Sequence, residues 1–137
     1  MSGGFRDEPD IEELEEDIAD FLSRTGSVGL LHEVSPLKDK GSRFSELDDK
    51  VDVSSSTLTK RLDEACELKI LEVKLESTDY GSNKVYVLTG LGRRLRDRME
   101  RMRIFRTYSK MKTLEEELDE AVEDLREQVT GELFRRE

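Results

Sequence analysis

Five short hydroxyl side chains and one leucine fill residues 54–59, and two cations, Lys60 and Arg61, follow directly. Hydroxyl groups both donate and accept hydrogen bonds, and their short side chains let a helix approach a surface closely. The base edges of a nucleic-acid groove present matching donors, acceptors and thymine methyl groups. The same residues could instead only cap and solvate a helix. The elements around them must therefore decide between the two interpretations.

A predicted helix positions these residues. Ser54 suits its N-cap, and apolar residues recur along one side at the spacing of a buried stripe, at Leu58, Leu62 and Ala65. At 100° per residue, Ser56 and Lys60 lie opposite that stripe. Acidic side chains follow further along the exposed face, so only the first two turns of the helix can approach a polyanion.

The flanking patterns predict a winged helix-turn-helix. Helices are expected over residues 10–25 and 27–34. A third helix, with Phe44, Leu47 and Val51 on its apolar side, leads through a brief turn into the hydroxyl-bearing helix. Residues 70–77 and 84–89 alternate apolar and polar side chains, which predicts a two-stranded wing with a long tip. The predicted fold class is therefore α+β and mostly α.

A long helical region closes the chain. Thr89 caps a helix, and Thr113 with Glu116 repeats the capping pattern, so residues 89–129 form either one helix or two, with Gly131 as the predicted end. We expect a flexible N-terminus over residues 1–9, a winged helix DNA-binding domain over 10–88 and a dimerisation region over 89–137. The residues predicted to form the dimer seam are Leu14, Ile18, Leu95, Met99, Met102, Phe105, Leu114, Leu118, Ala121 and Leu125.

A winged helix gives the hydroxyl cluster a target. The second helix of a helix-turn-helix lies in the major groove of DNA, its N-terminus offers N–H groups to phosphate, and nearby cations hold the backbone. Polar residues at the wing tip can reach a minor groove. The predicted DNA-binding residues are Arg43, Ser54, Ser55, Ser56, Thr57, Thr59, Lys60, Arg61, Lys74, Tyr80, Ser82, Asn83 and Lys84.

Charge adds an expectation about the host. The 137 residues carry a formal net charge of −10, and 41% of them are charged. A broadly acidic surface stays hydrated in molar salt and predicts a halophilic archaeon. We expect K⁺ ions to bridge carboxylates and phosphates, so that affinity for DNA depends weakly or positively on KCl. Residues 84–112, with ten basic and two acidic side chains, form a belt that binds phosphate or pairs with the acidic terminal helices.

Other function classes are disfavoured. No apolar run approaches the ~18 residues of a membrane span, and the N-terminus lacks a signal-peptide pattern, so we predict a cytoplasmic protein. Cys66 and His32 are the only cysteine and histidine, so a zinc site is excluded and no metal or cofactor is expected. Cys66 is interpreted as a helical residue at the core edge rather than a redox sensor, and His32 as packed on its helix. Without a paired nucleophile and base, or a glycine-rich phosphate loop, an enzyme is not predicted.

Three segments carry a family resemblance: "RFSEL", "LTKRL" and "YVLTGLG" occur in this order. Together they resemble the HxlR-type winged helix transcriptional regulators, relatives of the PadR type, over about residues 18–102. The resemblance implies a DNA-binding homodimer that responds to an oxidant, a small molecule or another stress signal. It also implies a glycine where the recognition helix ends, a place that "ELK" occupies here.

Two other functions remain open. A protein-interaction winged helix would dock a basic partner on its acidic surface and never contact DNA. A chromatin protein would bind DNA without regard to sequence. The sequence gives neither the operator nor the signal, and it does not distinguish activator from repressor.

Overall fold

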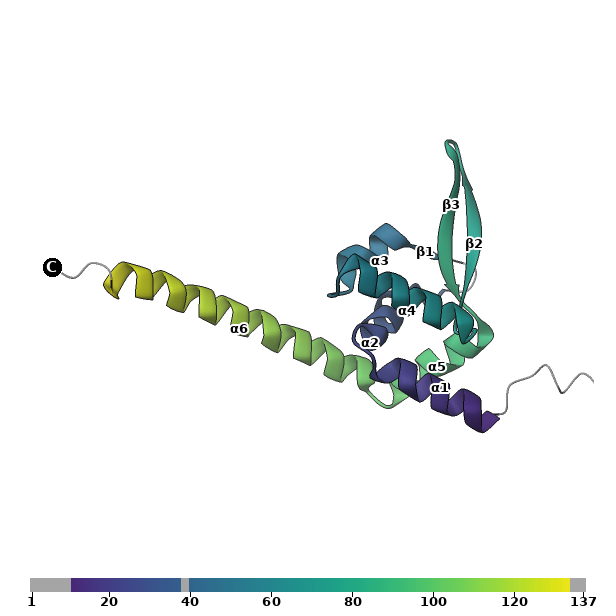
Figure 1. The fold of residues 1–137 in the computed structure, drawn as a ribbon, viewed down its shortest axis with the longest axis horizontal. Coiled ribbons are helices and arrows are strands. Elements are labelled where there is room, and N and C mark those ends of the chain that lie inside the picture. Colours follow the sequence, from purple (N-terminus) through teal and green to yellow (C-terminus); the bar gives the residue numbers. More distant parts are fainter. Residues whose placement is uncertain (1–10, 38–39, 134–137) are drawn as a thin grey trace, which may run out of the picture.

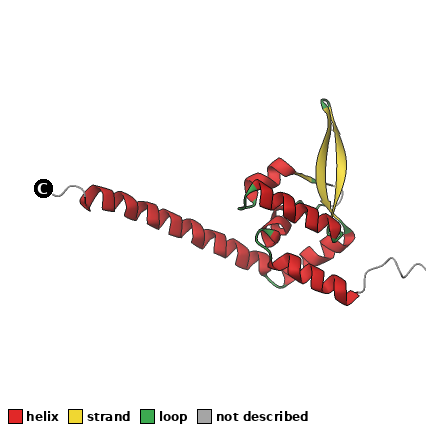
Figure 2. Cartoon of the chain, viewed as in Figure 1, coloured by secondary structure: helices red, strands yellow, loops and turns green. Residues whose placement is uncertain are grey.

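The computed structural model describes residues 11–37 and 40–133. Its elements in order are α1 (Ile11–Ser23), α2 (Ser27–Glu33), β1 (Ser42–Arg43), α3 (Phe44–Lys50), α4 (Ser55–Glu67), β2 (Leu71–Thr78), β3 (Gly81–Leu88), α5 (Gly90–Arg101) and α6 (Ile104–Leu133). Figure 1 shows α1 to α5 packed together, with the β2–β3 hairpin and α6 projecting from them in different directions. The predicted winged helix-turn-helix, mostly helical, is confirmed (Figure 2).

The helix-turn-helix consists of α3 and α4. The α3 helix begins after Arg43, whose backbone N–H donates to the Glu46 carboxylate at 2.8 Å. A short turn at residues 51–53 leads to Ser54, the predicted N-cap of α4, which accepts a hydrogen bond from the Thr57 N–H. At the far end, Lys69 has a φ of 63°, the left-handed conformation that usually favours glycine. The turn into the wing therefore forms although the chain has no glycine there.

The wing belongs to a three-stranded antiparallel sheet in the order β1-β3-β2. The hairpin was predicted, whereas β1 was not, because two residues are too few to show an alternating pattern. The wing tip is also tighter than predicted. Thr78 pairs with Gly81, which leaves only Asp79 and Tyr80 in the turn, and Gly81 has a φ of 123°.

One hydrophobic core joins the helices to the base of the sheet. Its most buried side chains are Phe21, Leu30, Leu31, Leu47, Leu58, Leu62, Ile70, Leu71 and Met99. Met99 lies on α5 and Phe105 begins α6, yet both belong to the same core cluster as Phe21. The core thus includes residues on both sides of residue 88.

The C-terminal region forms two helices, which answers the question left open by the sequence. The break falls at Met102 and Arg103, and Arg103 has a left-handed φ of 62°. The capping pattern at Thr113 marks no break, and α6 continues past Gly131 to Leu133. The left-handed residue turns the chain so that Phe105 packs into the core while the rest of α6 extends away from it (Figure 1).

Part of the expected organisation concerns residues that the structure does not describe. The predicted flexible N-terminus, residues 1–9, and residue 10, where the first helix was expected to begin, lie outside the described residues. Within residues 11–37 and 40–133, no helix combines the length and the apolar character needed to cross a bilayer.

Candidate nucleic-acid interface

The two sides of α4 differ sharply. Leu58, Leu62 and Ala65 are at most 1% exposed, as the predicted stripe requires. The opposite side presents exposed polar side chains to solvent, namely Ser55, Ser56, Thr59, Lys60 and Asp63, while Thr57 is half-buried. The core thus fixes the rotation of the helix and holds a row of short polar groups outward.

Several hydroxyl groups of this cluster also have structural partners. Ser54 Oγ caps α4 by accepting from the Thr57 N–H at 3.2 Å. Ser55 Oγ donates to the Asp48 carboxylate, with its two oxygens at 2.9 and 3.0 Å, which ties α4 to α3. Thr59 Oγ1 donates to the Ser55 carbonyl one turn earlier at 2.9 Å. Because a hydroxyl oxygen that donates one hydrogen bond can still accept others, Ser55 and Thr59 remain available as acceptors.

Arg61, predicted to contact DNA, has partners within its own chain. Its Nε donates to the Thr25 carbonyl at 2.7 Å and its guanidinium pairs with Glu64 at 2.8 Å. Its side chain is only 15% exposed. Arg24 pairs with the same Glu64 carboxylate. Arg61 therefore fastens α4 to the turn between α1 and α2. The i,i+3 spacing of Arg61 and Glu64 is a signal that sequence reasoning could have used.

The wing presents its candidates on different sides. Lys74 pairs in register with Val85, and Lys84 with Leu75. Because side chains alternate along a strand, these two lysines point to opposite faces of the hairpin. Lys74 pairs with Glu72 at 3.7 Å, and the Lys84 ammonium lies 5.8 Å from the centre of the Tyr86 ring. One DNA strand cannot contact both lysines from one face.

The wing tip and the strand beside it hold the remaining candidates. Tyr80 in the turn is fully exposed, Ser82 is exposed and Asn83 is half-buried. Arg43 on β1 pairs with Glu76 on β2 at 3.7 Å, with 45% of its side chain exposed. The tip is thus open to a ligand, whereas the Arg43 guanidinium already has a carboxylate partner within the sheet.

The predicted dimer seam is divided by the structure. Met99 and Phe105 are buried in the chain's own core, and the partly buried Leu95 and Ile18 pack against it. Leu14 is half-buried. The seam candidates that are exposed are Met102, Leu114, Leu118, Ala121 and Leu125. Met111 and Val122 are exposed on α6 as well and were missed by the sequence analysis.

Two arginines of the basic belt bind backbone carbonyls of their own chain. Arg96 Nε donates to the Leu31 carbonyl at 2.9 Å, and its guanidinium lies 5.0 Å from the centre of the Phe105 ring. Arg93 donates to the Leu88 carbonyl at 3.1 Å. Arg96 thereby supplies hydrogen-bond donors to carbonyl groups at the C-terminal end of α2 and holds α5 against that helix.

The lone cysteine and histidine have structural surroundings. Cys66 is half-buried at the edge of the core, and this burial, with a smaller contribution from Asp63, raises the pKa of its thiol. A raised pKa lowers the fraction of reactive thiolate. His32 packs against the rings of Phe105 and Tyr108, with centroids 5.3 Å from each. Within the described residues, no group of three or more potential metal ligands occurs.

Comparisons with known proteins agree with this geometry. A family model described as HxlR-like helix-turn-helix matches residues 30–119. The comparison with curated proteins gave no significant match. Among solved structures, the fold is similar to diamide-treated YodB from B. subtilis, with 22% identity, a TM-score of 0.54 and coverage of 66% of this chain and 86% of that chain.

Two further structures share the fold. A possible HxlR family transcriptional factor from Thermoplasma volcanium is 15% identical, with a TM-score of 0.54 and coverage of 69% of this chain and 82% of that chain. A MarR family regulator from Rhodococcus is 17% identical, with a TM-score of 0.52 and coverage of 84% and 82%.

Proposed function

The chain belongs to the HxlR-like helix-turn-helix family, and from this premise we propose that it regulates transcription by binding specific sequences of double-stranded DNA as a homodimer. The exposed row of α4 carries the proposal. Ser56, Thr59 and Lys60 stand on a helix whose other side is held in the core. Such a helix can enter a major groove without refolding, and its short polar side chains suit base edges.

Charge limits how α4 meets DNA. Asp63 and Glu67 are exposed further along the same helix, and they would repel phosphate. The N-terminal turns therefore enter the groove, with Lys60 as the cation nearest to the base edges. The exposed Tyr80 and Ser82 at the wing tip reach toward the flanking backbone or minor groove.

The homodimer forms along α6 in this proposal. Leu114, Leu118 and Leu125 are each more than half exposed, and their steps of four and seven residues make one stripe. A second copy of the stripe would cover them. A two-fold dimer presents two α4 helices, so the operator would contain two half-sites about one helical turn apart.

The signal is better explained by a small molecule than by thiol oxidation. A thiol sensor needs an exposed cysteine with a depressed pKa, whereas burial raises the pKa of the Cys66 thiol. For a host rich in salt, we further propose that affinity for DNA falls little, or rises, as KCl increases. A steep monotonic loss of affinity across a KCl titration would contradict that part of the proposal.

The test begins with selection of sequences from a pool of random duplexes by the full-length protein. Enrichment of a two-fold motif with half-sites about one turn apart is the expected result. Comparable affinity for selected and random duplexes would favour the chromatin function, and no DNA binding would favour the protein-interaction function.

Point variants then assign the contact. Lys60→Glu should weaken binding to the selected duplex by more than about tenfold, since it replaces a groove-facing cation with an anion. Lys110→Glu makes the same charge change on an exposed position of α6 and should have a much smaller effect. Equal losses in the two variants would count against α4 as the reading helix, and gel filtration verifies that both variants keep the dimer.

A further inference from the structure

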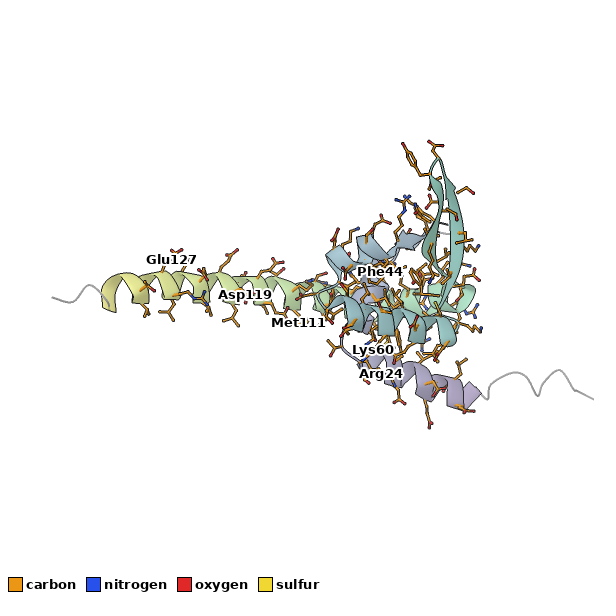
Figure 3. All side chains as sticks on the ribbon, turned by 45° about the horizontal axis from the view of Figure 1, so that its top comes forward. Arg24, Phe44, Lys60, Met111, Asp119 and Glu127 are labelled. Atoms are coloured by element: carbon orange, nitrogen blue, oxygen red, sulfur yellow. The ribbon has the colours of Figure 1, made fainter. Side chains whose placement is uncertain are left out.

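A pocket of about 440 Å³ lies where three parts of the chain meet. The turn between α1 and α2 forms one wall, the turn between α3 and α4 forms a second, and the first turns of α6 form the third. Figure 3 shows Met111, one of its lining residues, where α6 leaves the other helices. The volume falls within the range typical of small-molecule sites.

The walls of this pocket are mainly apolar. Val28 and Val51 line the helical side, while Ile104 and Met111 line the side of α6. Four charged side chains also line the pocket: Arg24 and Lys112 are positive, and Asp52 and Glu115 are negative. Because the two signs balance, these side chains do not select a charged ligand, and the apolar walls favour an uncharged one.

A tyrosine supplies the polar group inside. The Tyr108 hydroxyl lies so close to Gly29 that a Cβ atom there would be 2.6 Å from its oxygen, so only glycine leaves room for it. Among the described residues, this hydroxyl has no hydrogen-bond partner. Burial, with the nearby carboxylates of Glu33, Asp52 and Glu115, raises the pKa of Tyr108, which keeps the hydroxyl protonated as a donor. A ligand atom that accepts a hydrogen bond would satisfy it.

The position of the pocket connects the two parts of the proposed regulator. Residues 51–53, which line it, directly precede Ser54, the N-cap of α4. Ile104, Tyr108 and Met111 belong to α6, the proposed dimer helix. A ligand between them would contact both the start of α4 and the first turns of α6. In the proposed dimer, α6 sets the distance between the two α4 helices.

We infer that this pocket is an effector site for an uncharged aromatic molecule of one or two rings that carries a hydrogen-bond acceptor. The ring system packs between the valines of the helical side and Ile104 and Met111, and its acceptor meets the Tyr108 hydroxyl. The inference rests on the proposed function, because occupancy changes affinity for DNA by altering the angle between α6 and the start of α4.

The experiment uses the full-length protein and the neutral naphthalene ketone Prodan, whose emission shifts to the blue in apolar surroundings. Wild type should bind it at one saturable site per chain. Tyr108→Phe keeps the ring but removes the donor and should weaken binding about three- to tenfold. Thr107→Trp, at an exposed lining position, should fill the pocket and abolish the blue shift. Glu120→Trp, on the other side of α6, is the matched control and should bind as wild type does.

The second measurement is the affinity for the selected duplex with and without saturating Prodan. We expect a change of at least about fivefold in wild type and none in Thr107→Trp. The inference is overturned if wild type shows no saturable Prodan site. A second subunit that covers the pocket would give this result. It is also overturned if Thr107→Trp binds Prodan as wild type does, or if Prodan leaves the affinity of wild type for DNA unchanged.

The two proposals can fail separately. DNA binding without a Prodan site removes the effector pocket alone. A Prodan site without any DNA binding removes the proposed function and the regulatory role of the pocket, but leaves the ligand site in place.

Discussion

Helices α4 and α6 carry the same kind of apolar stripe, but the stripe is buried in α4 and exposed in α6. In α4 the stripe is covered by the chain itself, and Leu58 and Leu62 are at most 1% exposed. In α6 it remains open, with Leu114 and Leu118 each 63% exposed. A repeating apolar pattern therefore shows that a helix needs a neighbour. It does not show whether that neighbour lies in the same chain.

The polar sides of the two helices differ as well. The exposed N-terminal face of α4 offers hydroxyl groups and Lys60. The exposed length of α6 is dense in carboxylates, with Asp119 and Glu127 on the part that projects from the other helices (Figure 3). This difference supports the proposal that α4 approaches DNA and that α6 contacts another copy along its apolar side.

The largest effect should come from removing a covered leucine. Leu58→Ala leaves a cavity in the core and should lower the free energy of unfolding by about 2–5 kcal/mol. The matched change Leu118→Ala removes an exposed side chain and should have a much smaller effect when the chain is dilute enough to be monomeric. Urea titrations at low protein concentration measure both, and similar losses would contradict the comparison.

The second prediction concerns association. Leu118→Asp places a carboxylate in the apolar stripe of α6, where a second copy would have to bury it. We expect the dissociation constant of the dimer to rise by about 100-fold, with the circular dichroism of the isolated chain unchanged. Thr113→Asp adds the same charge at an exposed position off the stripe and is the control. Sedimentation equilibrium showing an intact Leu118→Asp dimer would place the interface elsewhere.

A third prediction separates two neighbouring hydroxyl groups of α4. Ser55→Ala removes the bond to Asp48 and should lower the free energy of unfolding by about 1 kcal/mol. Ser56→Ala removes only a 3.2 Å contact with the Ser54 hydroxyl, so it should cost less stability than Ser55→Ala and should weaken binding to the selected duplex instead. Thermal melts and gel shifts on the two variants test this, and the reverse assignment would show that Ser55 is the base-contacting group.

The smallest effect is a pH dependence at Cys66. Burial raises the pKa of this thiol in the folded chain, so the unfolded chain ionises first as pH rises. The thiol therefore leaves stability unaffected below the pKa of the unfolded chain and slightly reduces it above about pH 8.5. The rate at which iodoacetamide alkylates Cys66, followed by mass spectrometry, should begin to rise at a higher pH in the native chain than in the chain unfolded by urea. Faster alkylation of the native chain near pH 7 would instead indicate a thiol sensor.

Local patterns made part of the molecule predictable. The stripe of α4 and the cap at Ser54 follow from spacings within a few residues, and both are confirmed. Contacts between distant residues were not predictable. Arg61 binds a carbonyl 36 residues earlier in the chain and Arg96 one that is 65 residues earlier, and nothing local marks either partner. For this reason, spacing alone did not reveal that Arg61 has partners within the chain or that Met99 and Phe105 lie in the core.

The left-handed residue at Arg103 has a mechanical consequence. The α6 helix has 30 residues, so it extends about 45 Å from this joint. A swing of about 10° there would carry its far end through about 8 Å, more than two base-pair steps of a duplex. In the proposed dimer, a small change in backbone angle at Arg103 would therefore change the spacing of the two α4 helices enough to alter how both fit the same DNA.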